Sequence, residues 1–383
     1  MSTATSSDTA ADTSARPILH TYGRLAFGYS QSNYVQVLGL ARGRPAAASM
    51  QNSTSVQGSW SPVYVPLAPV TLSDLVVCAG NNTTQAIGLG TDGNIYPVGK
   101  KISGGSWQAA SGSPVTQSKK FKAGTLRFQL INTSTVFAVA SDGGAWVATY
   151  RSQDAQPVWK PGYQLPQPTT SIFQSLAARP DLSDAGTTHA IALAGSGVAY
   201  EVATAKGPGV GVNNWTAGAG ALGGGATLPT FSQLVLVSGD CNSTFHVIGL
   251  GTDGSVWDID QFAVKGSTLG WSKKSKNIVP AGTITVGPID FYLSNPAGSI
   301  VINLVKAVTG GLQVFAQFSQ TGWNSASISI ATSGGSTSWR LINNLVAGTG
   351  VLALGLGSTG FAYELAYFDG NTWTAGSRSP ISG

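Results

Sequence analysis

The chain has 383 residues, a formal net charge of +5 and a pI near 9.1; 42% of its residues are hydrophobic and only 10% are charged. It holds 50 glycines but only two glutamates, Glu201 and Glu364, so it is poor in a residue that normally builds helix surfaces. The hydrophobic content and the ten tryptophans exclude a disordered chain, and the mild basic excess permits acidic partners without requiring them.

The first sixteen residues, MSTATSSDTAADTSAR, are polar and predict a tail outside the fold. They lack the basic and apolar segments of a secretory signal, and no run of 18 apolar residues predicts a membrane span. The localisation is therefore left open by the sequence. Synthesis in the cytoplasm, with non-classical release or association with a virion or another surface, is compatible with these features.

One phrase recurs along the rest of the chain: a β-like run, a short aliphatic strand, a polar turn with glycine, and a strand that opens with an aromatic residue. In the clearest copy, LVVCAG at 75–80 precedes AIGLGTDGNIY at 86–96. The hairpin phrases lie, in chain order, at 37–47, 86–96, 136–146, 190–200, 247–257, 305–315 and 353–363. The first and sixth copies are degenerate, and the turns are 49 to 57 residues apart. Repetition of this length indicates one architecture built from similar units.

A tryptophan follows each of these turns by 14 to 19 residues and keeps the same period. These recurring tryptophans are Trp60, Trp107, Trp159, Trp215, Trp271, Trp323 and Trp373. Each repeat therefore contains about four short strands: the run, the two arms of the hairpin and the strand that carries the tryptophan. Two independent markers with one period make the repeat a specific signal.

Four antiparallel strands repeated about every 50 residues predict an all-β fold, a seven-bladed β-propeller. We expect a tail at 1–16 and a single domain at 17–383. The expected blades are 17–69, 70–116, 117–167, 168–226, 227–285, 286–334 and 335–383. Cys78 falls in the second blade and Cys241 in the fifth, too far apart for a disulfide, so both are expected to be free thiols.

The turn sequences GLGTDG at 88–93 and 249–254 and GLGSTG at 355–360 match the glycine spacing of a dinucleotide-binding turn. That turn leads into a helix whose N-terminus binds the pyrophosphate, whereas a strand-like segment follows every copy here. We therefore interpret them as hairpin turns, in which Asp-Gly supplies a positive φ, and we expect no cofactor.

Metal ligands are also poorly represented. The three histidines, His20, His189 and His246, belong to different repeats and have no ligand spacing, so no metal site is expected. Asp258 and Asp260 in WDID come nearest to a calcium-binding series. Two carboxylates two residues apart on a strand share a face, and we expect a solvated or salt-bridged pair there.

No set of residues predicts catalysis, because the arginines are scattered and neither paired carboxylates nor a Ser-His-Asp arrangement can be assigned. We expect a protein that is not an enzyme. Lysine clusters occur at 100–101, 119–122 and 273–276 and are expected to be solvated surface that discourages pairing of outer strands. They lack interleaved arginines and aromatic residues, so no nucleic-acid partner is expected.

The recurring tryptophans have two interpretations. A large aromatic side chain at the blade periphery can seal one blade against the next, or a partly exposed indole can stack on the apolar face of a sugar ring. Both use the same wide apolar surface, and the sequence does not separate them. The turn aromatics are further candidates for lining the grooves, although packing is favoured for them. They are Tyr96, Trp146, Tyr200, Trp257 and Tyr363.

The aliphatic strand, the Gly-Thr-Asp-Gly turn, the aromatic residue and the Gly/Ser-Trp-Ser segment together resemble the seven-bladed propeller lectins typified by Photorhabdus lectin. The phrase DGSVW at 253–257 also resembles tectonin-type propellers, whose repeats are shorter. The first resemblance implies fucose or related glycan binding in shallow pockets between blades, no catalysis, and frequent oligomers. The family usually carries a further Trp or His after the turn, which this chain replaces with segments such as PVGK and DIDQ. Fewer than seven working pockets are therefore expected.

Three hypotheses follow. The first is a multivalent lectin for glycans or glycoconjugates that uses the recurring tryptophans, with a homo-oligomer as one possible state. The second is a protein-interaction or surface-assembly propeller without sugar binding, as in a virion or an appendage. The third is a propeller enzyme that acts on polysaccharide. Fold alone does not separate them.

Overall fold

In a computed structural model, the chain folds into β-strands, and no helix occurs among the residues that the structure describes. The described residues are 24–30, 34–41, 44–50, 60–63, 70–79, 83–102, 107–109, 113–115, 119–125, 127–131, 133–151, 158–159, 162–168, 170–180, 187–205, 215–224, 227–238, 244–265, 268–285, 288–294, 300–309, 311–330, 332, 338–343, 351–356, 361–369, 371–376 and 381. The expected tail at 1–16, Cys241 and the side chain of Cys78 lie outside them, so the tail and the free thiols stay predictions.

Within the described ranges, the strands form seven antiparallel sheets, each made of consecutive strands. The first comprises β1 (Arg24–Ser30), β2 (Tyr34–Ala41), β3 (Arg44–Met50) and β4 (Trp60–Val63). The second comprises β5 (Leu72–Ala79), β6 (Thr83–Gly90), β7 (Ile95–Ile102) and β8 (Trp107–Ala109). The third comprises β9 (Arg127–Ile131), β10 (Thr133–Val139), β11 (Ala145–Arg151), β12 (Val158–Trp159) and β13 (Tyr163–Gln164).

The remaining four sheets repeat this order. The fourth comprises β14 (Phe173–Pro180), β15 (Thr188–Ala194), β16 (Ala199–Ala205) and β17 (Trp215–Ala221). The fifth comprises β18 (Phe231–Ser238), β19 (Phe245–Gly251), β20 (Val256–Lys265), β21 (Thr268–Trp271) and β22 (Lys276–Val279). The sixth comprises β23 (Ile289–Ser294), β24 (Val301–Val308), β25 (Gly311–Ser319) and β26 (Gly322–Ile330). The seventh comprises β27 (Ser338–Asn343), β28 (Val351–Leu356), β29 (Ala362–Phe368) and β30 (Trp373–Ala375).

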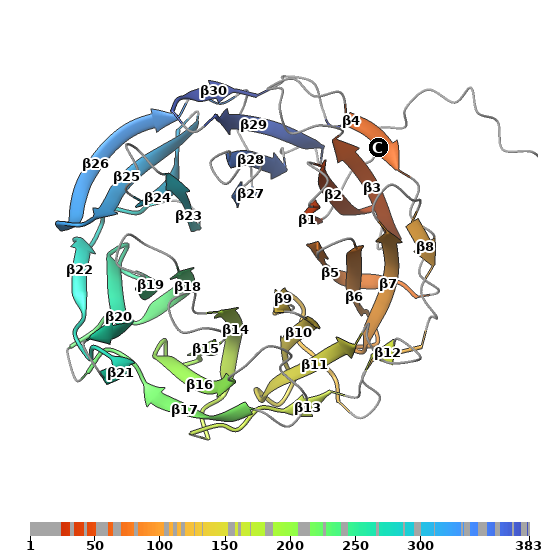
Figure 1. Ribbon diagram of the computed structural model, residues 1–383, viewed down its shortest axis with the longest axis horizontal. Helices are drawn as coiled ribbons and strands as arrows, with labels where there is room; N and C mark the ends of the chain where they lie inside the picture. Colours follow the sequence, from red (N-terminus) through yellow and green to blue (C-terminus); the bar gives the residue numbers. More distant parts are fainter. Residues whose placement is uncertain are drawn as a thin grey trace, which may run out of the picture.

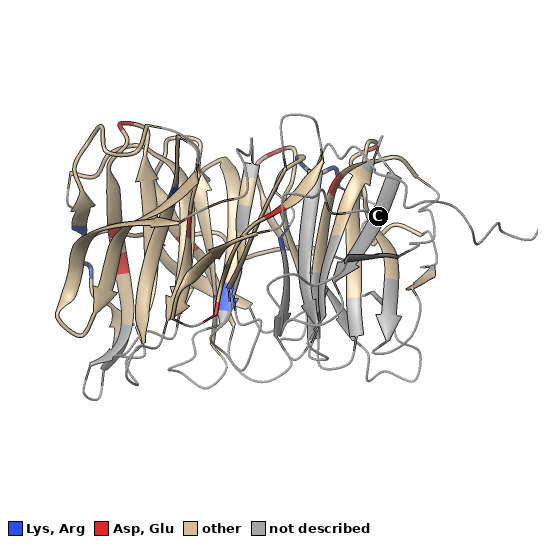
Figure 2. Ribbon diagram, turned by 90° about the horizontal axis from the view of Figure 1, so that it is seen from above, with Lys and Arg blue, Asp and Glu red and all other residues tan. Residues whose placement is uncertain are grey.

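The sheets stand around a central axis, with the first strand of each sheet nearest the axis and the last strand at the rim (Figure 1). Seen edge-on, the ring is a disc whose strands run between its two faces (Figure 2). This arrangement confirms the predicted β-propeller. The first and seventh sheets lie side by side, and in the described part of the chain neither contains a strand of the other. The same part of the chain has no helix long and apolar enough to cross a membrane.

The repeated hairpin joins the second and third strands of a sheet. In the second sheet, the Gly93 amide donates to the Gly90 carbonyl at 2.9 Å, and Gly93 has a φ of 80°. Gly143, Gly197 and Gly254 close equivalent turns with φ values between 77° and 89°. A strand follows each of these turns, so the interpretation as hairpin turns is confirmed there, and the glycine supplies the left-handed backbone conformation that the turn requires.

The connectors between sheets pass between consecutive turns on one face of the disc. The Phe121 amide donates to the Gly93 carbonyl of the second sheet, and the Ser141 amide of the third-sheet turn donates to the Lys120 carbonyl, at 2.9 and 2.8 Å. The first type of bond recurs in Phe173 to Gly143, Phe231 to Gly197 and Ile284 to Gly254. The connectors at 120–121, 172–173 and 230–231 therefore each fix two neighbouring turns by backbone hydrogen bonds.

The hydrophobic core lies between neighbouring sheets, because the second to sixth sheets each contribute apolar side chains to a cluster on either face. One cluster joins Leu38 and Leu40 of β2 to Leu72 and Leu75 of β5. Strands β15 and β19 are buried along their whole length. We call each interface between consecutive sheets a seam. A single sheet could not bury these faces alone, so stacking of the sheets creates the core.

Candidate functional site

The structure places all seven recurring tryptophans on the strands at the rim: β4, β8, β12, β17, β21, β26 and β30. The side chains of Trp60 and Trp159 lie outside the described part. The other five indoles point into seams, where they meet buried clusters or the aromatic rings of neighbouring strands. The position is therefore equivalent from sheet to sheet, as the repeat predicts, and the exposure of each indole distinguishes its possible roles.

Three of these indoles are almost completely buried. Trp107 and Trp215 are each 6% exposed and Trp323 is 9% exposed. Trp215 on the fourth sheet meets Phe137 of the third sheet edge-on, with ring centroids 5.5 Å apart. Trp107 belongs to the cluster that contains Leu38 of the first sheet. At these three positions the geometry favours the packing interpretation.

Trp271 and Trp373 are different, because both are partly exposed. The Trp271 ring lies 5.3 Å from the Phe262 ring and 5.6 Å from the His189 ring of the preceding sheet, and its Nε1 has no hydrogen-bond partner. The Trp373 ring lies 5.2 Å from that of Tyr292, and its Nε1 donates to the Tyr292 hydroxyl at 3.2 Å. Each indole is thus held by aromatic neighbours while part of its surface meets solvent.

The turn aromatics lie at the other end of the sheets. On β17, Trp215 pairs with Ala205 of β16, whereas Ala221 pairs with Tyr200. Six residues of extended strand separate the two positions by about 20 Å. The structure therefore does not bring the turn aromatics and the recurring tryptophans together in one groove.

Four of the turn aromatics are partly exposed: Trp146, Tyr200, Trp257 and Tyr363. Tyr96 is 7% exposed, and its hydroxyl donates to Asp92 at 2.8 Å. Trp257 donates through Nε1 to the Ser255 hydroxyl at 3.0 Å. These contacts stabilise the turns and leave aromatic surface on the face that carries them.

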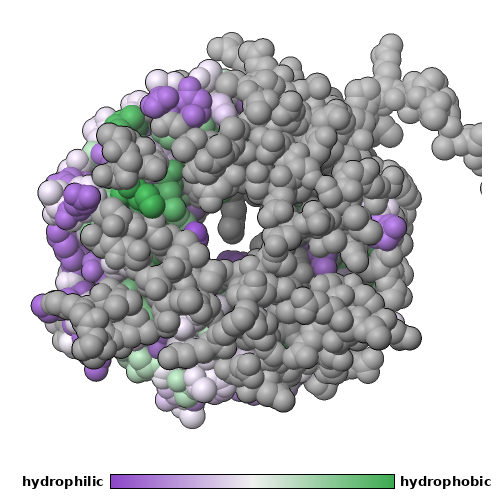
Figure 3. Space-filling view, viewed as in Figure 1, coloured by the Kyte–Doolittle hydropathy of each residue, from purple (hydrophilic) through white to green (hydrophobic). Residues whose placement is uncertain are grey.

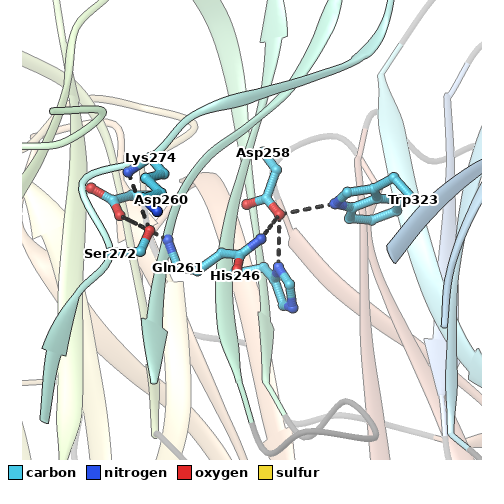
Figure 4. Close-up of polar contacts among 7 residues, drawn as sticks. All are labelled: His246, Asp258, Asp260, Gln261, Ser272, Lys274 and Trp323. Carbon is cyan, nitrogen blue, oxygen red and sulfur yellow. Dashed lines mark hydrogen bonds and ion pairs between the residues drawn. The ribbon is translucent and has the colours of Figure 1, made fainter. Parts of the chain in front are cut away.

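The buried interior of the fifth sheet contains a carboxylate with three side-chain donors. Asp258 Oδ2 lies 2.9 Å from His246 Nδ1, 2.6 Å from Gln261 Nε2 and 2.9 Å from Nε1 of Trp323 on the sixth sheet (Figure 4). Asp258 and His246 are completely buried. Hydrogen bonds to a carboxylate are short and strong, so Oδ2 of Asp258 ties the two sheets together, whereas its Oδ1 is buried with no hydrogen-bond partner among the described residues. The expectation of a solvated pair at Asp258 and Asp260 is wrong, because both side chains are buried and hydrogen-bonded. Asp258 faces His246, which forms an ion pair with it when protonated.

Asp258 and Asp260 do not share partners, although they are two residues apart. A bulge in β20 shifts the register, so that Asp258 pairs with Ile248 and Asp260 with Val247. Asp260 instead accepts bonds from the Ser272 hydroxyl and from backbone amides, including that of Gly223, which precedes the fifth sheet. Its role is to fix two segments of backbone.

A second buried pair occurs at the equivalent place in the fourth sheet. His189 Nδ1 lies 2.6 Å from Glu201 Oε1, and both residues are buried. In both sheets the histidine precedes the acid by 12 residues. The same strand position is polar and buried in the second and third sheets, where Gln85 and Thr135 occupy it. These buried pairs are absent from the sequence predictions. The buried polar residue of β6, β10, β15 and β19 stands eight residues before the turn glycine in each of these sheets, and this constant spacing is a usable signal.

No group of three or more His, Cys, Asp or Glu side chains within the described ranges is arranged to hold a metal ion. Three of the buried acids, Glu201, Asp258 and Asp260, accept hydrogen bonds from histidine, amide, indole, hydroxyl and backbone donors. The chemistry that the described residues offer is therefore aromatic stacking and hydrogen bonding at the seams and turns.

No protein-family model and no curated protein sequence matches the chain. The solved structure of BP39L lectin from Burkholderia pseudomallei is similar, with a TM-score of 0.67 and 17% identity, over 94% of this chain and 100% of that one. A mutant of AofleA from Arthrobotrys oligospora gives a TM-score of 0.48 and 14% identity, over 80% and 86% of the two chains. A puromycin hydrolase mutant gives a TM-score of 0.48 and 14% identity, over 92% of this chain and 54% of that one. The first likeness supports the propeller fold, and at these identities none assigns an activity.

Proposed function

We propose that this protein is a non-enzymatic lectin that binds fucose-like or related glycans in shallow pockets at the seams between sheets. The observation that carries the proposal is the pair of partly exposed indoles, Trp271 and Trp373, at equivalent rim positions of the fifth and seventh sheets. A flat aromatic surface of this kind suits the apolar face of a sugar ring. The similar fold of BP39L lectin is in keeping with this role.

The aromatic neighbours hold each candidate platform in place. Phe262 and His189 support Trp271, and Tyr292 and Phe368 support Trp373, with centroid distances of 5.2 to 5.6 Å. Such support limits the rotamer freedom of the indole, so a ligand meets a surface that is already oriented. Hydroxyl groups of the rim strands, as in Thr374 next to Trp373, can complete the polar side of a pocket.

Several such pockets on one ring provide avidity. A single shallow sugar site binds weakly, but linked sites raise the overall affinity by roughly 10²- to 10⁴-fold without new contacts. The buried indoles Trp107, Trp215 and Trp323 are assigned to packing in this proposal. Trp60 and Trp159 remain candidates from the repeat alone, so the number of pockets is expected to be smaller than the number of repeats.

A glycan array with parallel tryptophan fluorescence tests the proposal. Replacement of Trp271 and Trp373 together by Ala is expected to weaken array binding and the fluorescence response to sugar while the protein stays folded. Trp215→Ala is the matched control because it removes an indole assigned to packing, and it is expected to cost about 3–5 kcal/mol of stability. A folded double variant that binds glycans as the parent does would contradict the assignment of these two indoles. A parent protein that binds no glycan on a broad array would overturn the lectin proposal itself.

A second candidate function, a protein-interaction platform, rests on a separate observation. Ile172 and Val198 are 62% and 38% exposed, and the Gly195 amide of the fourth-sheet turn donates to the Ile172 carbonyl at 2.9 Å. Two exposed aliphatic residues therefore lie on the turn face, on segments that a backbone hydrogen bond joins. Light scattering that reveals a stable large assembly, lost in Ile172→Ser, together with a negative glycan array, would favour this candidate.

A further inference from the structure

The sequence contains the pattern Lys-Lys-x-Lys twice, at 119–122 and at 273–276. The first copy lies in the connector before the third sheet, and its ammonium groups are all engaged. Lys119 forms an ion pair with Asp142 at 2.7 Å, Lys120 donates to the Asn94 side chain at 3.1 Å, and Lys122 donates to the Phe173 carbonyl at 3.2 Å. This copy stabilises the turn face of the fold.

The second copy lies on the rim of the fifth sheet, at the interruption between β21 and β22. Lys273, Lys274 and Lys276 are all exposed, and none of their ammonium groups has a hydrogen bond or an ion pair with a described residue. Figure 2 shows basic residues at the rim on the left, where β22 lies in Figure 1. The same rim is hydrophilic at β22 and β26 (Figure 3). The same sequence pattern thus has an internal role in one place and none in the other.

The backbone that carries the second copy is fixed from inside. Asp260 Oδ1 accepts a bond from the Lys273 amide at 2.9 Å. It also accepts the Ser272 hydroxyl at 2.9 Å, and the Ser272 hydroxyl accepts the Lys274 amide at 3.2 Å (Figure 4). Lys273 has a φ of 53°, and it is the one non-glycine residue with a positive φ within the described ranges. A lysine in this conformation has a strained backbone, and the hydrogen bond from its amide to the buried Asp260 carboxylate maintains that strain. The lysines therefore project from a fixed segment.

None of these three ammonium groups is paired with an acid among the described residues. Asp258 and Asp260 of the same sheet are buried, and the remaining described acid of the sheet, Asp253, lies in the hairpin turn with Ser255. The three lysines lie within four residues, which span at most about 10 Å of backbone. The partly exposed Trp271 stands two residues before Lys273. An unpaired positive strip beside an open indole suits a ligand with both sugar rings and anionic groups.

We propose that Lys273, Lys274 and Lys276 bind the sulfate or carboxylate groups of an anionic polysaccharide, one of whose rings stacks on Trp271. The inference rests on the proposed function and specifies the class of glycan for the pocket of the fifth sheet. Lysine ammonium groups act as hydrated point charges, which fits spaced anionic groups on a flexible chain. A single-stranded nucleic acid would require successive aromatic platforms along a basic groove, and Trp271 is one platform only.

Three polymers of matched length test the inference: dextran sulfate, carboxymethyl dextran and unmodified dextran. The variant Lys273→Gln/Lys274→Gln/Lys276→Gln is expected to lose about tenfold in affinity for at least one of the two anionic polymers, as three exposed ion pairs predict. Binding of that polymer by the parent protein is expected to weaken between 50 and 300 mM salt, because exposed charges are screened. Comparison of the affinities for dextran sulfate and carboxymethyl dextran shows whether sulfate or carboxylate is the preferred anionic group.

The matched control is Lys119→Gln/Lys120→Gln/Lys122→Gln, which removes the same formal charge. It is expected to keep the parent affinity within about twofold while it lowers thermal stability, because these ammonium groups are used inside the fold. Equal losses in both triple variants would overturn the inference in favour of an effect of net charge. Equally tight binding of single-stranded DNA, lost in the same rim variant, would overturn it in favour of a nucleic-acid surface.

The outcome also separates this inference from the lectin proposal. A parent protein that binds neutral glycans, with anionic polymers bound no more tightly than dextran, would overturn the lysine assignment and leave the lectin proposal intact. A parent protein that binds neither neutral nor anionic glycans would overturn both.

Discussion

Two neighbouring seams each contain a tryptophan packed against a histidine of the preceding sheet, but the tryptophans differ in hydrogen bonding and exposure. Between the fifth and sixth sheets, Trp323 meets His246 with centroids 6.1 Å apart, and its Nε1 donates to Asp258. Between the fourth and fifth sheets, Trp271 meets His189 at 5.6 Å, but its Nε1 has no hydrogen-bond partner. The first indole is buried and the second is partly exposed.

The acid behind each histidine also differs between the two seams. The aspartate Asp258 presents one oxygen to three donors, and one of them belongs to the next sheet. The longer Glu201 binds His189 with one oxygen and accepts the Ala219 amide of its own sheet with the other, at 2.7 Å. The Glu201 carboxylate therefore bonds within the fourth sheet and not across the seam. Seams of similar backbone geometry can thus differ in whether a side-chain hydrogen bond crosses them.

The largest effect is expected for Asp258→Ala. This change leaves His246, Gln261 and Trp323 without their common acceptor, and since each buried donor left unpaired costs about 1–3 kcal/mol, the expected loss is about 3–5 kcal/mol. Urea unfolding at neutral pH measures the change in the free energy of unfolding. Asp253→Ala, in an exposed turn, is the control and is expected to cost about 1 kcal/mol or less. A cost at Asp258 no greater than at Asp253 would show that the carboxylate does not hold the seam.

A smaller and more specific effect is expected from the pair Trp323→Phe and Trp271→Phe. Both changes remove an indole N–H, but only Trp323 has an acceptor for it, so its loss leaves a buried carboxylate with one donor fewer. The expected costs are about 1–3 kcal/mol for Trp323→Phe and less than about 1 kcal/mol for Trp271→Phe, measured by thermal unfolding. Equal costs would remove the hydrogen bond as the source of the difference between the seams.

The sequence predicts the repetitive part of this fold well, for a physical reason. A turn such as Thr-Asp-Gly is specified by residues next to each other, because Gly93 and Gly254 must adopt positive φ whatever lies around them. The period of the turns then fixes the order of strands in each sheet. The propeller can therefore be predicted from the turn residues and the period at which they recur.

The side-chain contacts within the seams cannot be predicted in the same way. Trp323 and Asp258 are 65 residues apart, and no local feature of either one marks the other as its partner. The bulge that separates the directions of Asp258 and Asp260 has no signature in WDID. Exposure of Trp271 and burial of Trp215 depend on how two sheets meet, and the tryptophans stand at the same place in the repeat. The two Lys-Lys-x-Lys copies differ for the same reason.

A third prediction compares two glycines of the same backbone conformation near these seams. Gly197 in the fourth-sheet turn has a φ of 77°, and a Cβ there would collide with Thr230 and lie 2.9 Å from the Phe231 amide nitrogen of the connector. Gly282 has a φ of 78° and open space around it. Alanine at Gly282 is expected to cost about 1–2 kcal/mol for the left-handed conformation alone. Gly197→Ala is expected to cost at least 1 kcal/mol more. Urea unfolding of both variants checks the difference, and equal costs would mean that the connector yields without loss of stability.

The smallest effect concerns an exposed carboxylate, in contrast to buried Asp258. The Lys119 ammonium, and then the Gly144 amide, hold the pKa of Asp142 below its usual range. A carboxyl group whose pKa is lower in the folded state stabilises the fold above the unfolded pKa, near 4, and this contribution is lost as the pH falls through the folded value. Since the side chains of Lys119 and Asp142 are 38% and 52% exposed, the contribution is at most a few tenths of a kcal/mol. Lys119→Gln is expected to raise the pKa of Asp142 in an NMR titration and to reduce the loss of Tm between pH 5 and pH 3. An unchanged titration of Asp142 in that variant would contradict the ion pair.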